Sequence, residues 1–172
     1  MYENKALTTT LQSIESGTIP ILGLSLTNHP NISAGQYISK ANTQTIPQFT
    51  ADNLDADKTY LVAVLDLDTP LISFSFLAPI LHLLQPGAKF KGGSTSFSEE
   101  AIASWHPAGP PPSAAPHRYQ CLLYEQPSTF DVAKYRKPGG YGMRDRIRFR
   151  WDEFEEANGL GKPIATNYFT SN

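Results

Sequence analysis

The order of apolar and polar positions along the chain predicts a mainly β protein with a few short helices. The clearest signal is residues 60–66 (YLVAVLD), a nearly continuous apolar run typical of a strand that is buried on both faces of a sheet. Residues 80–85 (ILHLLQ) and 119–125 (YQCLLYE) predict two further buried strands, which end at Pro86-Gly87 and at Gln126-Pro127. Shorter extended segments are expected within 18–27 and 35–50.

The C-terminal third predicts one more strand and a helix. Residues 146–151 (RIRFRW) alternate charged and apolar side chains, as a strand with one wet face does, so the arginines from Arg144 to Arg150 are expected to form a solvated strand face that could dock an acidic partner. In the segment that follows, Trp151, Phe154 and Ala157 recur at helical spacing, and Gly159 is well placed to end the helix. No repeat or low-complexity linker divides the chain, so we expect residues 1–172 to form a single domain.

Composition narrows the function classes. The 172 residues carry 14 Lys and Arg against 16 Asp and Glu, a formal net charge of −2, so general nucleic-acid binding is not expected. The single cysteine, Cys121, excludes an internal disulfide and a zinc site built from several cysteines. No apolar run approaches the ~20 residues that span a bilayer, and the first residues lack the apolar core of a signal peptide. We therefore expect no transmembrane segment and a cytoplasmic location.

Two histidines interrupt apolar strands and are the first candidates for chemistry. His82 lies inside ILHLLQ and His117 opens HRYQCLLYE, and a buried imidazole needs partners for both ring nitrogens. Either could be a core histidine that backbone carbonyls satisfy. However, Asp66 and Asp68 lie at a strand end beside a proline turn, where carboxylates are costly unless they are paired or belong to a site. His117 and Tyr119 are two residues apart on one strand, so they point to the same face.

Three motifs then suggest a family: residues 66–70 (DLDTP), the stretch from Gly109 into HRYQCLLYEQ (117–126), and PIATNYF (163–169). All three resemble motifs of the phosphatidylethanolamine-binding protein (PEBP) family. The first resembles the family's Asp-Pro-Asp-x-Pro motif, the second its Gly-x-His-Arg-Tyr signature with a Tyr-Glu-Gln ending, and the third its C-terminal segment. His82 falls sixteen residues after Asp66, where that family has a pocket histidine.

The resemblance implies a fold and a binding pocket. The PEBP-like fold has a large central antiparallel sheet, a smaller sheet on one side and short helices on the other. The implied pocket binds anions such as phosphate, phosphoethanolamine head groups or carboxylates. Carried over to this chain, its ligand-binding residues would be Asp66, Asp68, His82, Gly109, Pro110, His117 and Tyr119.

The residue types at these positions fit an anion-binding pocket, and departures from the family pattern change the ligand that the pocket is expected to accept. Two imidazoles, a phenol and the backbone N–H groups of the Gly109 loop can donate to an anion. Asp66 would repel the anion, so we interpret it as the group that orients a histidine and holds it protonated, or as protonated itself. Pro110 to Pro112 are expected to form a rigid wall. The family's internal proline is replaced by Leu67, and the apolar segment 71–79 (LISFSFLAP) predicts a mouth that accepts a hydrophobic small molecule.

Two functions from different classes stay open at this point. One is a non-enzymatic protein that binds a small anionic, phosphorylated or organic ligand and regulates or inhibits a protein target such as a kinase or a peptidase. The other is an enzyme of secondary-metabolite biosynthesis in which Asp66, His82 and His117 perform acid–base isomerisation, dehydration or cyclisation on a lipophilic metabolite. Neither needs a cofactor, and the sequence has no phosphate loop or dinucleotide fingerprint. A metal site at the two histidines is the weakest alternative, and we expect none.

Overall fold

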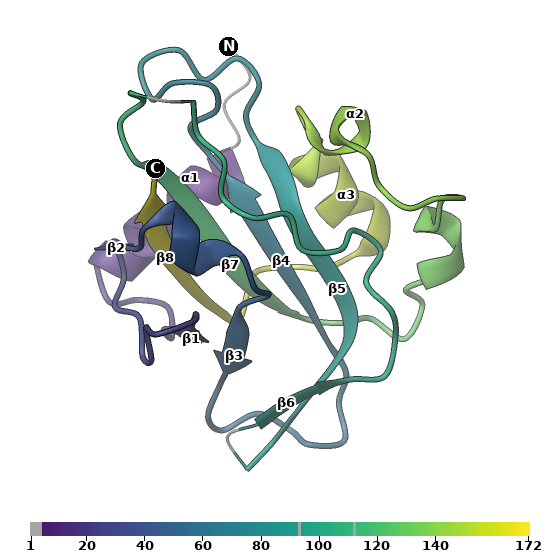
Figure 1. Ribbon diagram of the computed structural model, residues 1–172. Helices are drawn as coiled ribbons and strands as arrows, with labels where there is room; N and C mark the ends of the chain where they lie inside the picture. The colour runs from purple at the N-terminus through teal and green to yellow at the C-terminus, as the bar shows by residue number, and fades with distance from the viewer. Residues whose placement is uncertain (1–4, 93, 112) are drawn as a thin grey trace.

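Six strands form one curled sheet in the computed structural model, which describes residues 5–92, 94–111 and 113–172 (Figure 1). The strand order is β2-β8-β7-β4-β5-β6. The strands are β2 (Gln36–Tyr37), β4 (Tyr60–Asp66), β5 (Ile80–Lys91), β6 (Ser94–Phe97), β7 (His117–Glu125) and β8 (Ala165–Ser171). A separate two-stranded sheet pairs β1 (Gly23–Ser25) with β3 (Gln48–Thr50). The mainly β prediction is confirmed, with one correction: β2 runs parallel to β8, so the large sheet is mixed rather than antiparallel throughout.

The central strand β4 is buried along its whole length, as its apolar sequence predicts. Its side chains alternate between two cores, because successive residues of a strand point to opposite faces. Val62 and Val64 pack with the β1–β3 sheet in one core, and Leu61 and Leu65 pack with the helices in the other. Asp66, the last residue of β4, therefore belongs to the face that the small sheet covers.

The helices are short. They are α1 (Lys5–Glu15), α2 (Met143–Arg146) and α3 (Trp151–Asn158), with 3-10 turns η1 (Lys40–Thr43) and η2 (Val132–Tyr135). The predicted C-terminal helix is confirmed: α3 buries Trp151 and Phe154 and ends just before Gly159, whose φ of 60° lies in the left-handed region that glycine favours. Ala157, the third residue of the predicted face, is exposed. In the part of the chain that the structure describes, no helix is long and apolar enough to cross a bilayer.

The strand predicted at residues 146–151 is wrong. Arg146 ends α2 and Trp151 begins α3. Between them, Arg148 has a φ of 55°, which a strand residue cannot adopt, and its N–H donates to the Leu77 carbonyl. The alternation of charged and apolar residues therefore reflects a short irregular segment that joins two helices.

The predicted end of β5 at Gln85 is also wrong, since the strand continues to Lys91. The ladder with β4 changes register at this point: Val62 pairs with Gln85, whereas Tyr60 pairs with Ala88. Pro86 and Gly87 thus lie in a β-bulge, where a residue without an N–H is tolerated. The bulge lets the chain pass through a Pro-Gly pair without leaving the sheet.

Candidate functional site

A second β-bulge in β5 positions His82. Val64 pairs with Leu83 and Leu65 pairs with Leu81, which leaves His82 as the extra residue. Bulges re-aim side chains and occur beside functional sites. The bulge also frees the His82 carbonyl, which accepts the backbone N–H of His106 at 2.9 Å and Nη1 of Arg146 at 3.3 Å. The imidazole is buried and lies edge-on to the Tyr119 ring.

His117 and Asp66 form a buried ion pair at the end of the central strand. Nδ1 of His117 lies 2.9 Å from Oδ2 of Asp66, and its Nε2 lies 3.2 Å from the Pro70 carbonyl. Both partners are acceptors, so both ring nitrogens carry hydrogen and the imidazole is cationic. Burial lowers the pKa of His117, but the hydrogen bond and charge of Asp66 outweigh it, and the pKa lies above its ordinary value. Thr69 donates its hydroxyl hydrogen to the same carboxylate.

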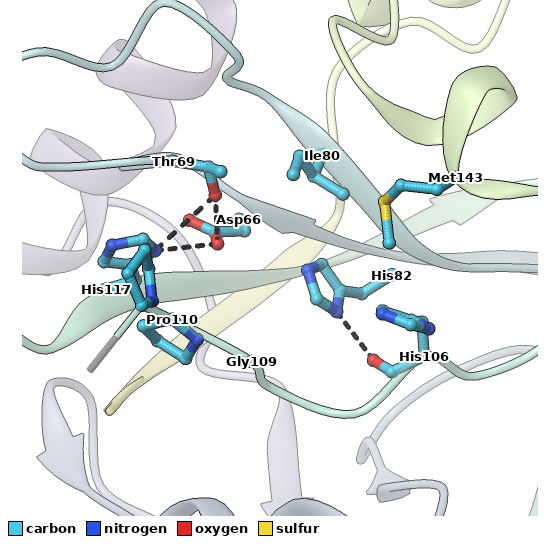
Figure 2. A pocket seen from close by; sticks show the side chains of 10 residues that line it. Asp66, Thr69, Ile80, His82, His106, Gly109, Pro110, His117 and Met143 are labelled. Carbon is cyan, nitrogen blue, oxygen red and sulfur yellow. Dashed lines mark hydrogen bonds and ion pairs between the residues drawn. The ribbon is translucent and has the colours of Figure 1, made fainter. Parts of the chain in front are cut away.

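His82 has the opposite charge state. Its Nδ1 lies 2.6 Å from the His106 carbonyl, which can only accept, so Nδ1 carries the hydrogen. Burial lowers the pKa of His82 to about 4, so the ring is neutral at pH 7 and its Nε2 has an unprotonated lone pair. Figure 2 shows this nitrogen on the side of the ring that faces Asp66 and His117. No described residue hydrogen-bonds to it.

A cavity of about 60 Å³ lies between the two histidines (Figure 2). Its lining comes from four strand residues, four residues of the loop after Trp105 and two neighbouring side chains: Asp66, Ile80, His82 and His117; His106, Gly109, Pro110 and Pro111; and Thr69 and Met143. At about 10–15 Å³ of such space per water, the cavity holds roughly four to six waters, or one carboxylate or phosphate group. A drug-sized ligand needs roughly 300 Å³ or more, so only a head group fits inside.

Two of the predicted pocket residues lie outside this lining. The Tyr119 ring is buried between Phe169, on which it stacks, and His82. Its hydroxyl lies beside Asp66 and the Gly109 backbone, but it makes no hydrogen bond to a described residue. Burial raises the pKa of this phenol, so it is a neutral donor without a partner. It is therefore placed behind the cavity wall.

Asp68 is committed to a different partner. It accepts three hydrogen bonds from Arg118: from the backbone N–H at 2.8 Å, from Nε at 2.8 Å and from Nη2 at 2.6 Å. A bidentate guanidinium–carboxylate pair of this kind is geometrically specific. It holds the turn that follows β4 against the start of β7, and so it fixes the positions of Asp66 and His117 relative to each other.

Arg146 corrects the prediction of a solvated arginine face and is a residue that the sequence analysis missed. Its side chain is buried and donates to the carbonyls of Leu81 at 3.1 Å, Ser104 at 2.9 Å and the bulged His82. Among the described residues no carboxylate forms an ion pair with it. The guanidinium thus joins the bulge in β5 to the loop that carries His106. Burial and the charge of Arg146 both lower the pKa of His106.

The loop after Trp105 supplies the other missed residue, His106, and most of the cavity wall. Trp105 anchors the loop through a 2.9 Å bond from Nε1 to the Thr43 carbonyl. Pro110 and Pro111 line the cavity, and Pro112, the third residue of the expected wall, lies outside the described residues. A methyl group at Gly109 would meet only the Pro107 carbonyl, at 3.9 Å. Within the described ranges no three His, Cys, Asp or Glu side chains gather as metal ligands.

Comparison with known proteins gives consistent matches. A family model described as "Phosphatidylethanolamine-binding protein" matches residues 26–169. The "Phomoidride biosynthesis cluster protein N" of Talaromyces stipitatus is 24% identical over 164 residues, which cover 86% of this chain and 82% of that protein. The "Carboxypeptidase Y inhibitor" of Saccharomyces cerevisiae is 27% identical over 155 residues, 76% of this chain and 67% of that protein. A crystal structure of carboxypeptidase Y inhibitor with its cognate proteinase has a TM-score of 0.73 at 20% identity and covers 96% of this chain and 95% of the other.

Proposed function

Because the chain belongs to the phosphatidylethanolamine-binding protein family, we propose that it binds a carboxylate or phosphate group of an organic ligand in the cavity between His82 and His117. The match over residues 26–169 confirms the family that the sequence motifs predict. One observation carries the proposal: the Nε2 of His82, which lines this cavity, faces Asp66 and His117 and has no hydrogen-bond partner among the described residues (Figure 2). Leaving a buried polar group unsatisfied costs about 1–3 kcal/mol, which a bound ligand recovers.

The charges around the cavity determine how an anion is held. Asp66 and His117 neutralise each other, and both N–H groups of His117 are already committed. An anion then meets the lone pair on Nε2 of His82, and this contact is repulsive unless a proton lies between them. Either His82 takes up that proton or the ligand brings it as an acid. In both cases, binding of a carboxylate takes up about one proton per anion at neutral pH, whereas phosphate, which is already partly protonated there, takes up less.

Calorimetric and NMR titrations with acetate and inorganic phosphate test the proposal. His82→Phe keeps the ring that packs on Tyr119 and removes the nitrogen that faces the cavity. A hydrogen bond to a charged group contributes about 1.5–3 kcal/mol, so affinity should fall at least about tenfold. The matched control is His29→Phe, because His29 lies outside the cavity lining and bonds to Asn42. The proposal is wrong if neither anion binds the native chain, or if His82→Phe binds both as well as the control does.

We further propose that binding serves regulation or inhibition of a protein target, with a peptidase favoured over a kinase. The support is the likeness to a protein named as an inhibitor of carboxypeptidase Y. Steady-state assays of carboxypeptidase Y and related serine carboxypeptidases with added protein test this directly. Saturable inhibition at a defined stoichiometry is the expected result, and unchanged activity at a large molar excess contradicts it.

A second candidate function is cofactor-independent acid–base catalysis on a metabolite. The observation in its favour is that an unprotonated imidazole nitrogen and a cationic imidazole, His82 and His117, line the same small space. The likeness to a biosynthesis-cluster protein supports a metabolite as the substrate. However, a base with a pKa of about 4 is poorly matched to proton abstraction at neutral pH, which favours binding over catalysis. Deuterium incorporation at carbon, measured by NMR on a bound organic acid in D₂O, would identify the enzyme.

A further inference from the structure

We propose that the chain has a second binding site, for a free α-amino acid, in a surface cleft of about 390 Å³ at the opposite end of the sheet from the cavity. We call it the distal cleft, and the residues that it uses are Lys58, Glu125, Gln126, Pro127 and Phe130. The inference does not depend on the proposed function, because β4 separates the two sites (Figure 1). Asp66 ends β4 and lines the cavity, whereas Lys58 lies just before β4 begins. At about 3.3 Å per residue, the two ends of the strand are roughly 20 Å apart.

Two loops form the distal cleft: the loop that ends at Thr59, before β4, and the loop that begins at Gln126, after β7. Antiparallel pairing of β4 with β7 brings these loops together, with Tyr60 opposite Glu125. The Gln126 N–H joins their bases by donating to the Thr59 carbonyl at 2.8 Å. The Gln126 side chain accepts the Gly87 N–H at 2.9 Å through Oε1, which leaves Nε2 of the same amide as a donor. The walls of the cleft are therefore fixed by hydrogen bonds within the chain.

An ion pair in the cleft offers both signs of charge to a ligand. Nζ of Lys58 lies 2.8 Å from Oε2 of Glu125, and the two side chains are 48% and 50% exposed. An ammonium has three donors and a carboxylate about four acceptor sites, so this one bond uses a fraction of their capacity. The neighbouring charges are balanced as well, since the Lys89 ammonium bonds to the Lys58 carbonyl at 2.9 Å and the Asp55 carboxylate acts on Lys58 from the other sign. The cleft therefore has no strong preference for a simple anion or a simple cation.

A molecule with adjacent opposite charges fits this pair best. Its carboxylate can accept from Lys58 and from Nε2 of Gln126 while its ammonium donates to Glu125. The four charges then alternate around a ring, and the native ion pair stays closed. A lone anion gains one contact and is repelled by Glu125, and a lone cation is repelled by Lys58. A free α-amino acid carries both charged groups on one carbon, whereas a peptide carries them at its opposite ends.

The rest of the lining selects the side chain of the ligand. Pro127 and Phe130 supply apolar groups, and the Phe130 ring is held in place because it stacks on Tyr135, with ring centroids 5.9 Å apart. Small-molecule sites have volumes of roughly 300–1,000 Å³, so the cleft has room for an amino acid with its whole side chain. An apolar amino acid such as leucine should therefore bind more tightly than glycine, by about threefold or more.

NMR titration of the whole protein with leucine tests the inference, with shifts read at the backbone amides of the cleft. Isocaproate and isoamylamine keep the leucine side chain but lack the ammonium and the carboxylate respectively, and each should bind about fivefold more weakly. Lys58→Met and Glu125→Gln should each weaken leucine binding by a similar factor, whereas the charge-swapped variant Lys58→Glu/Glu125→Lys should recover most of the affinity. The control is Arg136→Met, since Arg136 forms a similarly exposed ion pair with Glu99 outside the cleft.

Each result decides the inference. If leucine shifts none of these amides, or if isocaproate or isoamylamine binds as tightly, the inference is overturned. Leucine binding that survives Glu125→Gln, or that the charge-swapped variant does not recover, overturns it too. The substituted side chains are half exposed, so the variants should remain folded, and circular dichroism checks this. Binding of acetate and phosphate is read at residues of the cavity, so failure of the proposed function would not alter the result at the distal cleft.

Discussion

Replacing the buried Arg146 is the substitution with the clearest expected cost. Arg146→Met keeps an unbranched stem of similar length but removes every donor, so the buried Leu81 carbonyl and the part-buried carbonyl of Ser104, an exposed residue, both lose this partner. The His82 carbonyl keeps the His106 N–H. Leaving the buried Leu81 carbonyl without this bond costs about 1–3 kcal/mol, whereas water can replace the guanidinium at the carbonyl of the exposed Ser104. Relief from the desolvation of a buried cation offsets part of this cost, which leaves about 1–2 kcal/mol.

Urea unfolding followed by circular dichroism measures this difference. The matched control is Arg144→Met, because Arg144 lies two residues away in α2 and is exposed. A surface substitution of that kind should change the free energy of unfolding by no more than about 0.5 kcal/mol. Phosphate affinity should also fall in the folded fraction of Arg146→Met, since the bulge that aims His82 loses its support. If the two variants are equally stable within about 0.5 kcal/mol, the structural role of Arg146 is refuted.

Three further predictions concern the protonation of His82, the protonation of His117 and the free space beside Gly109. Burial lowers the pKa of His82 to about 4, so the free energy of unfolding of the native chain should fall by about 3 kcal/mol as pH falls from about 6.5 to 4. Urea unfolding measures this loss, and His82→Phe should not show it. The raised pKa of His117 acts in the opposite sense, because the stabilisation that it gives is complete below about pH 6.5 and is lost as pH rises through the pKa of the folded state. In Asp66→Asn, the free energy of unfolding should therefore no longer show this decrease above neutral pH. Gly109→Ala should leave the melting temperature nearly unchanged and weaken phosphate binding more than acetate binding, because the methyl meets only the Pro107 carbonyl yet narrows the cavity. Equal losses for both anions would contradict this.

The parts of the fold that the sequence predicted follow from local periodicity. β4 is recognisable because all of its residues are apolar up to Asp66, and α3 because its buried side chains recur at helical spacing before Gly159. The proximity of Asp66 to His117 also follows from strands that the sequence predicts. Each lies at the end of a recognisable strand, and antiparallel pairing of β4 with β7 brings those ends together.

The parts that the sequence did not predict depend on tertiary contacts. The two bulges in β5 are set by register with β4, and no local pattern marks His82 as the extra residue in one of them. Arg146 alternates with apolar residues as a surface strand would, but the carbonyls that the bulge leaves free draw it inward. Tyr119 shares the strand face of His117 as expected, yet stacking on Phe169 keeps it behind the cavity wall.

Nitrogen NMR of the histidine rings tests the central claim most directly, because it reports the protonation of His82 with and without an anion in the cavity. In the free protein at about pH 7, Nδ1 of His82 should carry a hydrogen and Nε2 should not. Saturation with phosphate or acetate should move the Nε2 resonance towards the protonated or hydrogen-bonded range, while the ring nitrogens of His29 stay unchanged. A His82 ring whose two nitrogens do not respond to either anion, or an Nε2 already protonated in the free protein, would contradict the account.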